Sequence, residues 1–226
     1  MRYGLLYAME KEAAGLLQKL DAKPLEPMAG ISFYSLPGGH ILCIGGVGKV
    51  NAAMATQILI GRFQVDAVLN AGCAGAFSDL PAGTIVVAET CVQHDVDTTL
   101  AGDPPGLVST VNCVEFPCAE PAEMRARLET LGYPVICGTV ATGDWFGRDF
   151  RRAAAIRARY GAAVCDMEAC AAAQVCLRNG ISFQALKVVS DHLFAEKQNE
   201  EYETNVAAAM ETLNAAVYAY LTGMED

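Results

Sequence analysis

Short runs of apolar residues alternate along this chain with segments in which apolar residues recur every three or four positions. Uninterrupted apolar runs predict buried strands, whereas the wider spacing predicts helices that bury one face. The order of these segments indicates an α/β sandwich around a mostly parallel sheet, with helices on both faces. The predicted strands are 2–7, 31–36, 40–45, 66–71, 84–89, 134–141 and 183–190, and the predicted helices are 9–20, 50–61, 121–131, 149–159, 167–178 and 199–222.

These elements are expected to form one domain, residues 1–226. No Ser/Gly/Pro-rich linker or shift of composition divides the chain, and 53% of its 226 residues are hydrophobic. Only 98–118 departs from the alternation, because Gly102-Asp103-Pro104-Pro105-Gly106 at its centre has turn chemistry and little periodicity. We expect a long loop there, of a kind that often serves a site or an interface.

Charge and hydropathy exclude several classes of partner. Sixteen Lys and Arg stand against 26 Asp and Glu, and the net charge of −10 repels nucleic acid and anionic lipid. The apolar stretch 1–9 is too short for a signal peptide or a transmembrane helix, and no later segment offers a long uncharged apolar run. We therefore expect a cytoplasmic protein that binds neither nucleic acid nor membranes.

The cysteines and histidines indicate neither a disulfide framework nor a metal site. The nine Cys are an odd set without a CxxC pair, so free and mostly buried thiols are expected. The three His are widely separated, and His94-Asp95-Val96-Asp97 alone is a weak metal signal. We expect no metal and no cofactor.

Two glycine-rich segments follow predicted strands. Gly45-Gly46-Val47-Gly48-Lys49-Val50-Asn51 opens a helix, where backbone N–H groups can approach a ligand, but it matches neither a Walker A loop nor GxGxxG. Asn70-Ala71-Gly72-Cys73-Ala74-Gly75-Ala76 leaves the carboxyl end of a strand, the edge at which open α/β sheets bind ligands. Its small residues either admit a ligand to the backbone or form a crowded turn.

Three acidic residues are candidates for a site. Asp191 follows the apolar strand 183–190, which has no structural need of a charge. Glu168 precedes an Ala-rich helix, where Asp166 and Glu168 are also explained as an N-cap and a complement to the helix dipole. Glu12 lies just after the first strand and would equally suit a solvated surface.

Six short segments hold most of these candidate residues. They are Met9-Glu10-Lys11-Glu12, Gly46-Val47-Gly48-Lys49-Val50-Asn51-Ala52-Ala53, Asn70-Ala71-Gly72-Cys73-Ala74-Gly75, Thr142-Gly143-Asp144-Trp145-Phe146, Met167-Glu168-Ala169 and Ser190-Asp191. In order and approximate spacing they resemble the purine nucleoside phosphorylase and nucleosidase superfamily, most of all the bacterial 5′-methylthioadenosine/S-adenosylhomocysteine nucleosidases. The resemblance implies a three-layer α/β sandwich with a central mixed sheet flanked by helices, a small-molecule nucleoside as substrate, and usually a homodimer.

The resemblance also implies roles for individual residues. Asp191 matches the general acid that protonates purine N7, Glu168 the carboxylate that binds the ribose hydroxyls, and Glu12 the group that orients the attacking water. Breaking a ribosyl C–N bond passes through an oxocarbenium-like state, so the leaving base needs a proton and the sugar a nearby carboxylate. Met167 and Phe146 match ribose and base contacts, and the other expected substrate-binding residues are Met9, Val47, Cys73, Ala74, Gly75 and Ser190.

The chain departs from the nucleosidase pattern at positions around the expected site. Cys73 stands where these enzymes commonly have Ser, and Lys187 where they commonly have Arg. The loop 98–103 also lacks the aromatic residues that the family's partner subunit contributes to the 5′-alkylthio pocket.

Hydrolysis that releases adenine is the expected reaction, and other reactions stay open. Phosphorolysis needs cationic donors around phosphate, and the phosphorylases place Arg where Asn70 lies. A related nucleoside hydrolase, such as a futalosine hydrolase, is another alternative. A non-catalytic nucleoside-binding protein is the fourth, but it would have no need of three acids at strand and helix ends.

Overall fold

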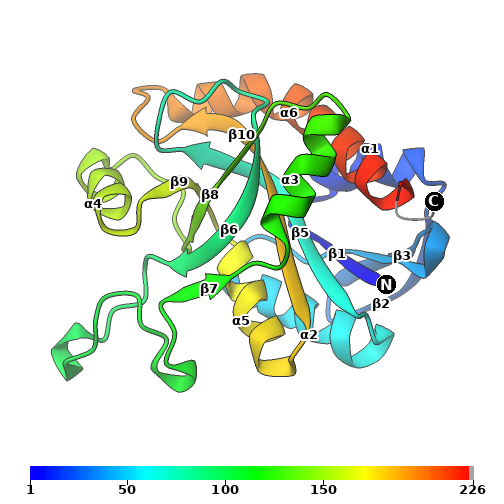
Figure 1. Ribbon diagram of the computed structural model, residues 1–226, viewed down its shortest axis with the longest axis horizontal. Helices are drawn as coiled ribbons and strands as arrows, with labels where there is room; N and C mark the ends of the chain where they lie inside the picture. Colours follow the sequence, from blue (N-terminus) through cyan, green and yellow to red (C-terminus); the bar gives the residue numbers. More distant parts are fainter. Residues whose placement is uncertain (224–226) are drawn as a thin grey trace.

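A ten-stranded sheet runs through the molecule and carries helices on both sides (Figure 1). The computed structural model describes residues 1–223. The strands are β1 Tyr3–Tyr7, β2 Lys23–Met28, β3 Ile31–Ser35, β4 Ile41–Ile44, β5 Ala67–Ala76, β6 Ile85–Gln93, β7 Glu115–Pro117, β8 Val135–Thr142, β9 Ala162–Asp166 and β10 Ser182–His192, and the helices are α1 Glu10–Lys19, α2 Lys49–Phe63, α3 Pro121–Thr130, α4 Phe150–Tyr160, α5 Ala169–Asn179 and α6 Gln198–Thr222.

The sheet is mixed, and part of it closes on itself. The strand order is β10-β6-β8-β9-β5-β1-β4-β3-β2, and β10 also pairs with β5, so five strands form a ring. One flat middle layer therefore does not describe this sheet. The expectation of mostly parallel pairing is also corrected, because antiparallel pairings (β10–β6, β2–β3, β3–β4, β5–β9, β6–β7) equal the parallel ones in the part of the chain that the structure describes.

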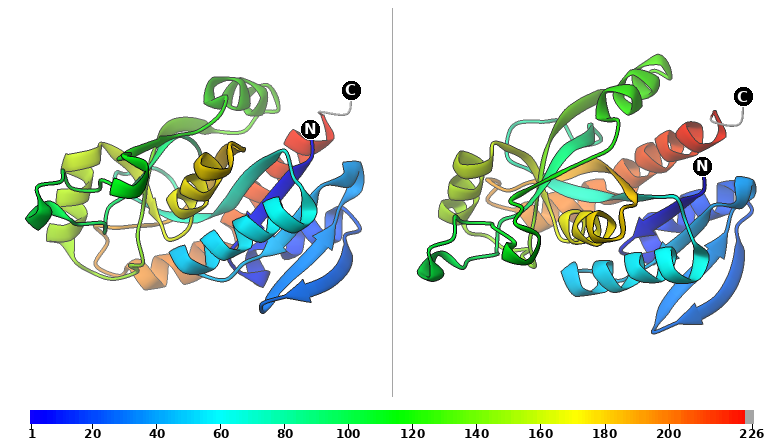
Figure 2. Two further views of the ribbon diagram at one scale, coloured as in Figure 1. Left: turned by 90° about the horizontal axis from the view of Figure 1, so that it is seen from below. Right: turned by 60° about the horizontal axis from the view of Figure 1, so that its bottom comes forward.

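Alternate residues of the inner strands face two apolar layers. Leu6 of β1 packs with the buried residues of α2 and α5, while its neighbour Leu5 packs with those of α1, α3 and α6. Figure 2 shows α2 and α5 side by side on one face of the sheet. The remaining helix, α4, packs separately from these two layers, through Ala153 and Ile156 against β8 and β9. The α/β architecture with helices on both faces is thus confirmed.

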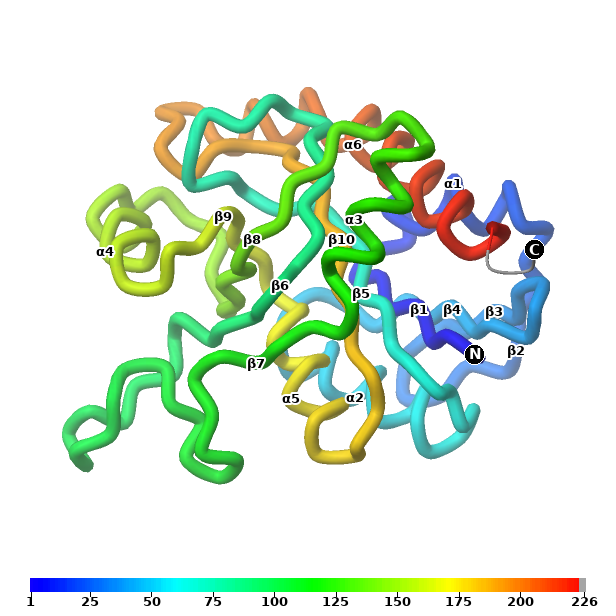
Figure 3. Tube along the Cα trace, in the orientation of Figure 1, coloured from blue at the N-terminus to red at the C-terminus, as the bar shows by residue number. Residues whose placement is uncertain are grey.

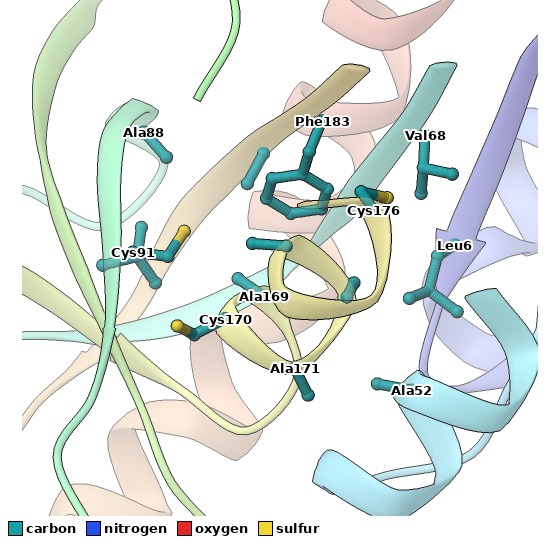
Figure 4. Packing of buried hydrophobic residues seen from close by; sticks show 14 of the residues in the cluster. Leu6, Ala52, Val68, Ala88, Cys91, Ala169, Cys170, Ala171, Cys176 and Phe183 are labelled. Atoms are coloured by element: carbon teal, nitrogen blue, oxygen red, sulfur yellow. The ribbon is translucent and has the colours of Figure 1, made fainter. Parts of the chain in front are cut away.

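Small residues let α5 approach the sheet and α2 closely. Ala169, Cys170 and Cys176 lie on the sheet side of α5, among residues such as Phe183 (Figure 4). Ala171 points toward Ala52 of α2, where both side chains are short enough for the helices to touch. All nine cysteines are free, and six of them are buried. The expectation of free, mostly buried thiols is confirmed.

Most predicted elements are present with ends shifted by at most two residues, the predicted strand 84–89 runs on to Gln93, and three strands were missed. β2 contains Pro24 and Pro27 and is largely exposed, which suits an edge strand but gives no apolar pattern. β7 is short and lies in the expected loop 98–118, and β9 is a short strand in a stretch to which no element was assigned. The predicted strand 66–71 continues to Ala76, so the glycine-rich segment 70–76 is strand rather than turn.

The expected loop 98–118 is an extended excursion. It contains two short 3-10 turns, Thr99–Ala101 and Ser109–Val111, and ends in β7. Figure 3 shows this segment projecting away from the sheet at the lower left. Within residues 1–223, no helix combines the length and the apolar character that crossing a bilayer requires.

Candidate active site

A cavity of about 340 Å³ opens at the carboxyl ends of β1, β4, β8, β9 and β10. Residues of β5 also line it. The structure brings all eleven predicted site residues to its wall: Met9, Glu12, Val47, Cys73, Ala74, Gly75, Phe146, Met167, Glu168, Ser190 and Asp191. Sequence reasoning missed seven other lining residues, which are Ala8, Trp145, Cys165, Asp166, Leu193, Gln198 and Tyr202.

Glu12 is a buried carboxylate whose two oxygens both accept hydrogen bonds. It lies in the first turn of α1 and is 2% exposed, so the solvated alternative is wrong. Its Oε2 accepts a hydrogen bond from the Met9 N–H at 3.0 Å, and its Oε1 accepts from the Cys73 N–H at 3.2 Å. The Cys73 thiol lies 3.1 Å from the same Oε1. Burial and then the Glu12 charge raise the pKa of Cys73 well above its ordinary value, so the thiol stays protonated and donates a hydrogen bond to Glu12.

Glu168 lies at the N-terminus of α5 but does not cap the helix with its side chain. Its Oε1 instead accepts a hydrogen bond from the Gly48 N–H at 2.9 Å. Gly48 has φ of +98°, a conformation that only glycine adopts without strain, so the glycine-rich loop is shaped for this contact. Burial, followed by repulsion from Asp166, raises the pKa of Glu168 to about 7.

Asp191 is the penultimate residue of the buried strand β10 and lines the cavity at 2% exposure. The Ser190 hydroxyl donates to Oδ1 at 2.6 Å, and the Gln198 amide donates to Oδ2 at 2.8 Å. Burial raises the pKa of Asp191, and these two hydrogen bonds offset only part of that effect. A Cβ on Gly75 would lie 2.9 Å from Oδ2, so the glycine leaves room for the carboxyl group.

Asp166 and Lys187 form a buried ion pair beside the cavity. Lys187 Nζ lies 2.7 Å from Asp166 Oδ2, and both side chains are almost fully buried. The same oxygen accepts from the Ala169 N–H at 2.8 Å, so Asp166 does bond the first amide of α5, but the N-cap position belongs to Glu168 and not to Asp166. Burial lowers the pKa of Lys187, but the carboxylates of Asp166 and Glu168 outweigh it and raise the pKa overall. Lys187, noted in the sequence for its place near the expected water site, thus neutralises Asp166.

Aromatic side chains form the outer part of the cavity. Phe146 is 53% exposed, and its ring meets the Tyr202 ring edge-on at a centroid distance of 5.7 Å. Trp145 packs on the other side against His94 and the Arg152 guanidinium. Rings that line a mostly apolar cavity offer faces for a planar ligand such as a heterocyclic base.

The wall combines four carboxyl groups, those of Glu12, Asp166, Glu168 and Asp191, with apolar surface and contains no Lys or Arg. Within residues 1–223, no cluster of His, Cys, Asp and Glu could hold a metal ion. A proton donor of raised pKa opposite two carboxylates suits a reaction in which a leaving group takes up a proton while positive charge develops nearby.

This fold and site define a member of the phosphorylase superfamily. The profile of that superfamily matches residues 2–222, and the chain belongs to it. Within the superfamily, the chain is 33% identical over its whole length to the 5′-methylthioadenosine/S-adenosylhomocysteine nucleosidase of Geobacillus thermodenitrificans, of which 98% is covered. The resemblance inferred from the six segments is therefore confirmed.

Solved structures show the same relationship. The crystal structure of a 5′-methylthioadenosine/S-adenosylhomocysteine nucleosidase from Colwellia psychrerythraea in complex with adenine is 34% identical, with a TM-score of 0.91 over 98% of this chain and 95% of that one. A futalosine hydrolase from Helicobacter pylori has a TM-score of 0.93 over 99% and 98% of the two chains. At 24% identity, the latter shows a shared fold.

Proposed function

We propose that this chain hydrolyses the N-glycosidic bond of an adenine nucleoside of the 5′-methylthioadenosine/S-adenosylhomocysteine type and releases adenine. The observation that carries the proposal is the meeting of Glu12, Glu168 and Asp191 in one cavity without a cation on its wall. The nucleosidase relatives, at 33% and 34% identity, support the same reaction and substrate class.

Asp191 is the proposed general acid. A glycosidic bond to a purine breaks more easily when the ring nitrogen N7 is protonated, because the base then leaves as a neutral species. Burial favours the protonated form of Asp191 and so prepares it to donate. The hydrogen bonds from Ser190 and Gln198 fix the carboxyl group in one orientation, which serves transfer to one ring position.

Glu168 and Glu12 are proposed to act on the sugar side. Ionised Glu168 accepts hydrogen bonds from the ribose hydroxyls and stabilises the positive charge that develops on the sugar. Glu12, with both oxygens already held by Met9 and Cys73, retains lone pairs that orient a water molecule toward the anomeric carbon. Met167 and Phe146 are proposed to contact the ribose and the base, and Met9, Val47, Cys73, Ala74, Gly75 and Ser190 complete the substrate-binding set.

Water is the proposed nucleophile rather than phosphate. A bound phosphate requires cationic or convergent N–H donors. The nearest buried cation, Lys187, already pairs with Asp166, and Asn70 donates to the Leu6 carbonyl instead of facing the cavity. Anionic phosphate would thus meet carboxylates without compensation.

The test is base release from 5′-methylthioadenosine by the purified chain, measured with and without phosphate. We expect adenine and a reducing sugar at the same rate in both conditions. Release that depends on phosphate and yields a sugar 1-phosphate would establish a phosphorylase. Tight nucleoside binding without turnover would establish a binding protein.

We also propose a homodimer in a reducing, cytoplasmic compartment. The proposed interface lies near the 98–118 excursion and α2, because Val50 and Met54 of α2 and Leu100 of the excursion are exposed apolar side chains. The free thiols suit a reducing compartment. A monomeric mass by light scattering at micromolar concentration would contradict the dimer.

A further inference from the structure

Lys11 places a positive charge at the rim of the cavity. It lies in the first turn of α1 beside Glu12, and its Nζ is 4.8 Å from the centroid of the Tyr202 ring. Tyr202, from α6, lines the cavity, and its interaction with Lys11 raises the pKa of the lysine. The ammonium group therefore stands beside the part of the wall formed by Tyr202.

Lys11 differs from the other two lysines near the cavity in having no ion-pair partner. Lys187 lies 2.7 Å from Asp166, and Lys49 lies 2.6 Å from Asp95. Within residues 1–223, no carboxylate oxygen lies within 4.0 Å of Lys11 Nζ; Glu203, whose charge contributes to the raised pKa, is farther away. The charge of Lys11 is thus available to a ligand.

A nucleoside bound as proposed directs its 5′ substituent toward this rim. In that pose Asp191 contacts the base and Glu168 contacts the two ribose hydroxyls. The 5′ carbon of the ribose, which contacts neither residue, then points toward the opening of the cavity. The exposed lining residues Phe146 and Val47 mark that opening, and the Phe146 ring contacts Tyr202. The end of a long 5′ substituent would therefore meet the ammonium group of Lys11.

We propose that Lys11, seated on Tyr202, recognises a carboxylate at the end of the 5′ substituent, so that the chain favours S-adenosylhomocysteine-type nucleosides over those that end in a neutral alkylthio group. This inference rests on the proposed nucleosidase function. A lysine ammonium on its flexible stem attracts a carboxylate without demanding one geometry, and the aromatic ring beneath it limits the positions that it visits. Lys11 is exposed, so solvent screening keeps the effect to about three- to fivefold in kcat/KM.

The experiment compares three nucleosides: S-adenosylhomocysteine, its carboxyl methyl ester, and 5′-methylthioadenosine. Each is assayed with the wild-type chain, Lys11→Met and Lys11→Arg, because Met keeps the apolar stem and Arg keeps the charge. Lys19→Met is the matched control, since Lys19 lies on the same helix with its Nζ 4.5 Å from the Tyr218 ring, and neither residue lines the cavity.

We expect Lys11→Met to lower kcat/KM for S-adenosylhomocysteine about three- to fivefold and to leave the ester and 5′-methylthioadenosine unchanged. Lys11→Arg and Lys19→Met should keep the wild-type ratios. Added salt should raise KM for the acid alone, because it screens an exposed charge.

Two results would overturn the inference. If all three substrates are hydrolysed and Lys11→Met leaves the ratios of their kcat/KM values unchanged, Lys11 does not recognise the carboxylate. The nucleosidase function would then still stand. If the ester loses as much as the acid, the recognised group is another part of the substituent. Failure of the proposed function is distinct, because the wild-type chain would then release adenine from none of the three.

Discussion

The backbone N–H of Gly48 lies 2.9 Å from Oε1 of Glu168 and joins two loops separated by 120 residues in the chain. The next residue, Lys49, donates its own N–H to Asp144 Oδ1 at 2.8 Å. Consecutive amides at the start of α2 therefore hold a cavity carboxylate and the loop that carries the cavity aromatics.

Replacing Gly48 by alanine should damage this arrangement. A side chain is strained at φ of +98°, and its Cβ would lie 2.9 Å from Asp144 Oδ1. We expect kcat/KM to fall about tenfold to hundredfold, because the loop must shift and Glu168 loses its donor.

Gly30→Ala is the matched control for Gly48→Ala. Gly30 also has a positive φ, but nothing lies within 4 Å of the added Cβ, and it does not line the cavity. Both variants should lose stability in urea unfolding, and only Gly48→Ala should lose activity. Equal activities would show that the Gly48 contact is dispensable.

Asp191→Asn tests the proposed general acid. The amide keeps the shape and can still accept a hydrogen bond, but it has no proton to transfer. We expect kcat to fall about 10²–10⁴-fold, while calorimetry with a nonhydrolysable adenine nucleoside still shows binding. Asp149→Asn, which alters a helix cap outside the cavity, should leave both unchanged. Near-wild-type turnover by a folded Asp191→Asn chain would exclude Asp191 from the mechanism.

The raised pKa of Glu168 predicts a pH dependence of activity. The ionised carboxylate stabilises the sugar cation, and its fraction in the free enzyme grows as pH rises through about 7. We therefore expect kcat/KM to rise on the acidic side with a midpoint near 7. Glu168→Gln should have a lower kcat/KM, and its pH profile should lack this rise on the acidic side. The same rise in the variant would assign the titration to another group.

The same pKa shift predicts a dependence of stability on pH. The folded pKa of Glu168 lies above its ordinary value of 4.5, so between these values the folded state binds more protons than the unfolded state. The contribution of Glu168 to the free energy of unfolding therefore becomes less favourable as pH rises from 4.5 to 7. Relative to wild type, Glu168→Gln should gain stability over this range, by an amount on the order of 3 kcal/mol. A pH-independent difference in urea unfolding would contradict this.

Breaking the Asp166–Lys187 pair should be costly. Lys187→Met leaves the Asp166 carboxylate buried without its cation, and we expect a loss of about 3–5 kcal/mol in the free energy of unfolding. The double variant Lys187→Met/Asp166→Asn removes both charges and should recover much of the loss, since the Asn oxygen can accept from the Ala169 N–H while its amide donates to the Thr142 hydroxyl. A single variant as stable as the double would show that the pair carries no such energy.

Sequence patterns located the parts of this site that lie next to regular apolar strands. Asp191 was identified because a charge at the end of β10 needs an explanation, and the structure places it on the cavity wall. Gln198 and Tyr202 lie on α6, and only the packing of that helix across the sheet brings them to the cavity. No local pattern reports such packing.

Lys187 shows a second limit of the sequence. Its position in an apolar strand was plain, but its partner Asp166 lies in β9, a short strand without a distinctive pattern. The closure of five strands was missed for a similar reason. It depends on the pairing of β5 with both β9 and β10, and a strand's own sequence does not specify how many neighbours it has.

The long helix α6 gives the site an order of assembly during protein synthesis. Asn214 of α6 donates to the backbone carbonyl of Glu12 at 2.8 Å and accepts from the Tyr7 hydroxyl at 2.9 Å, across more than two hundred residues. At about 5–20 residues per second, the ribosome takes about 10–40 s to make the intervening chain. The first acid of the site is thus translated well before Asn214, which supports it from α6, so a nascent chain has no finished cavity until α6 has emerged.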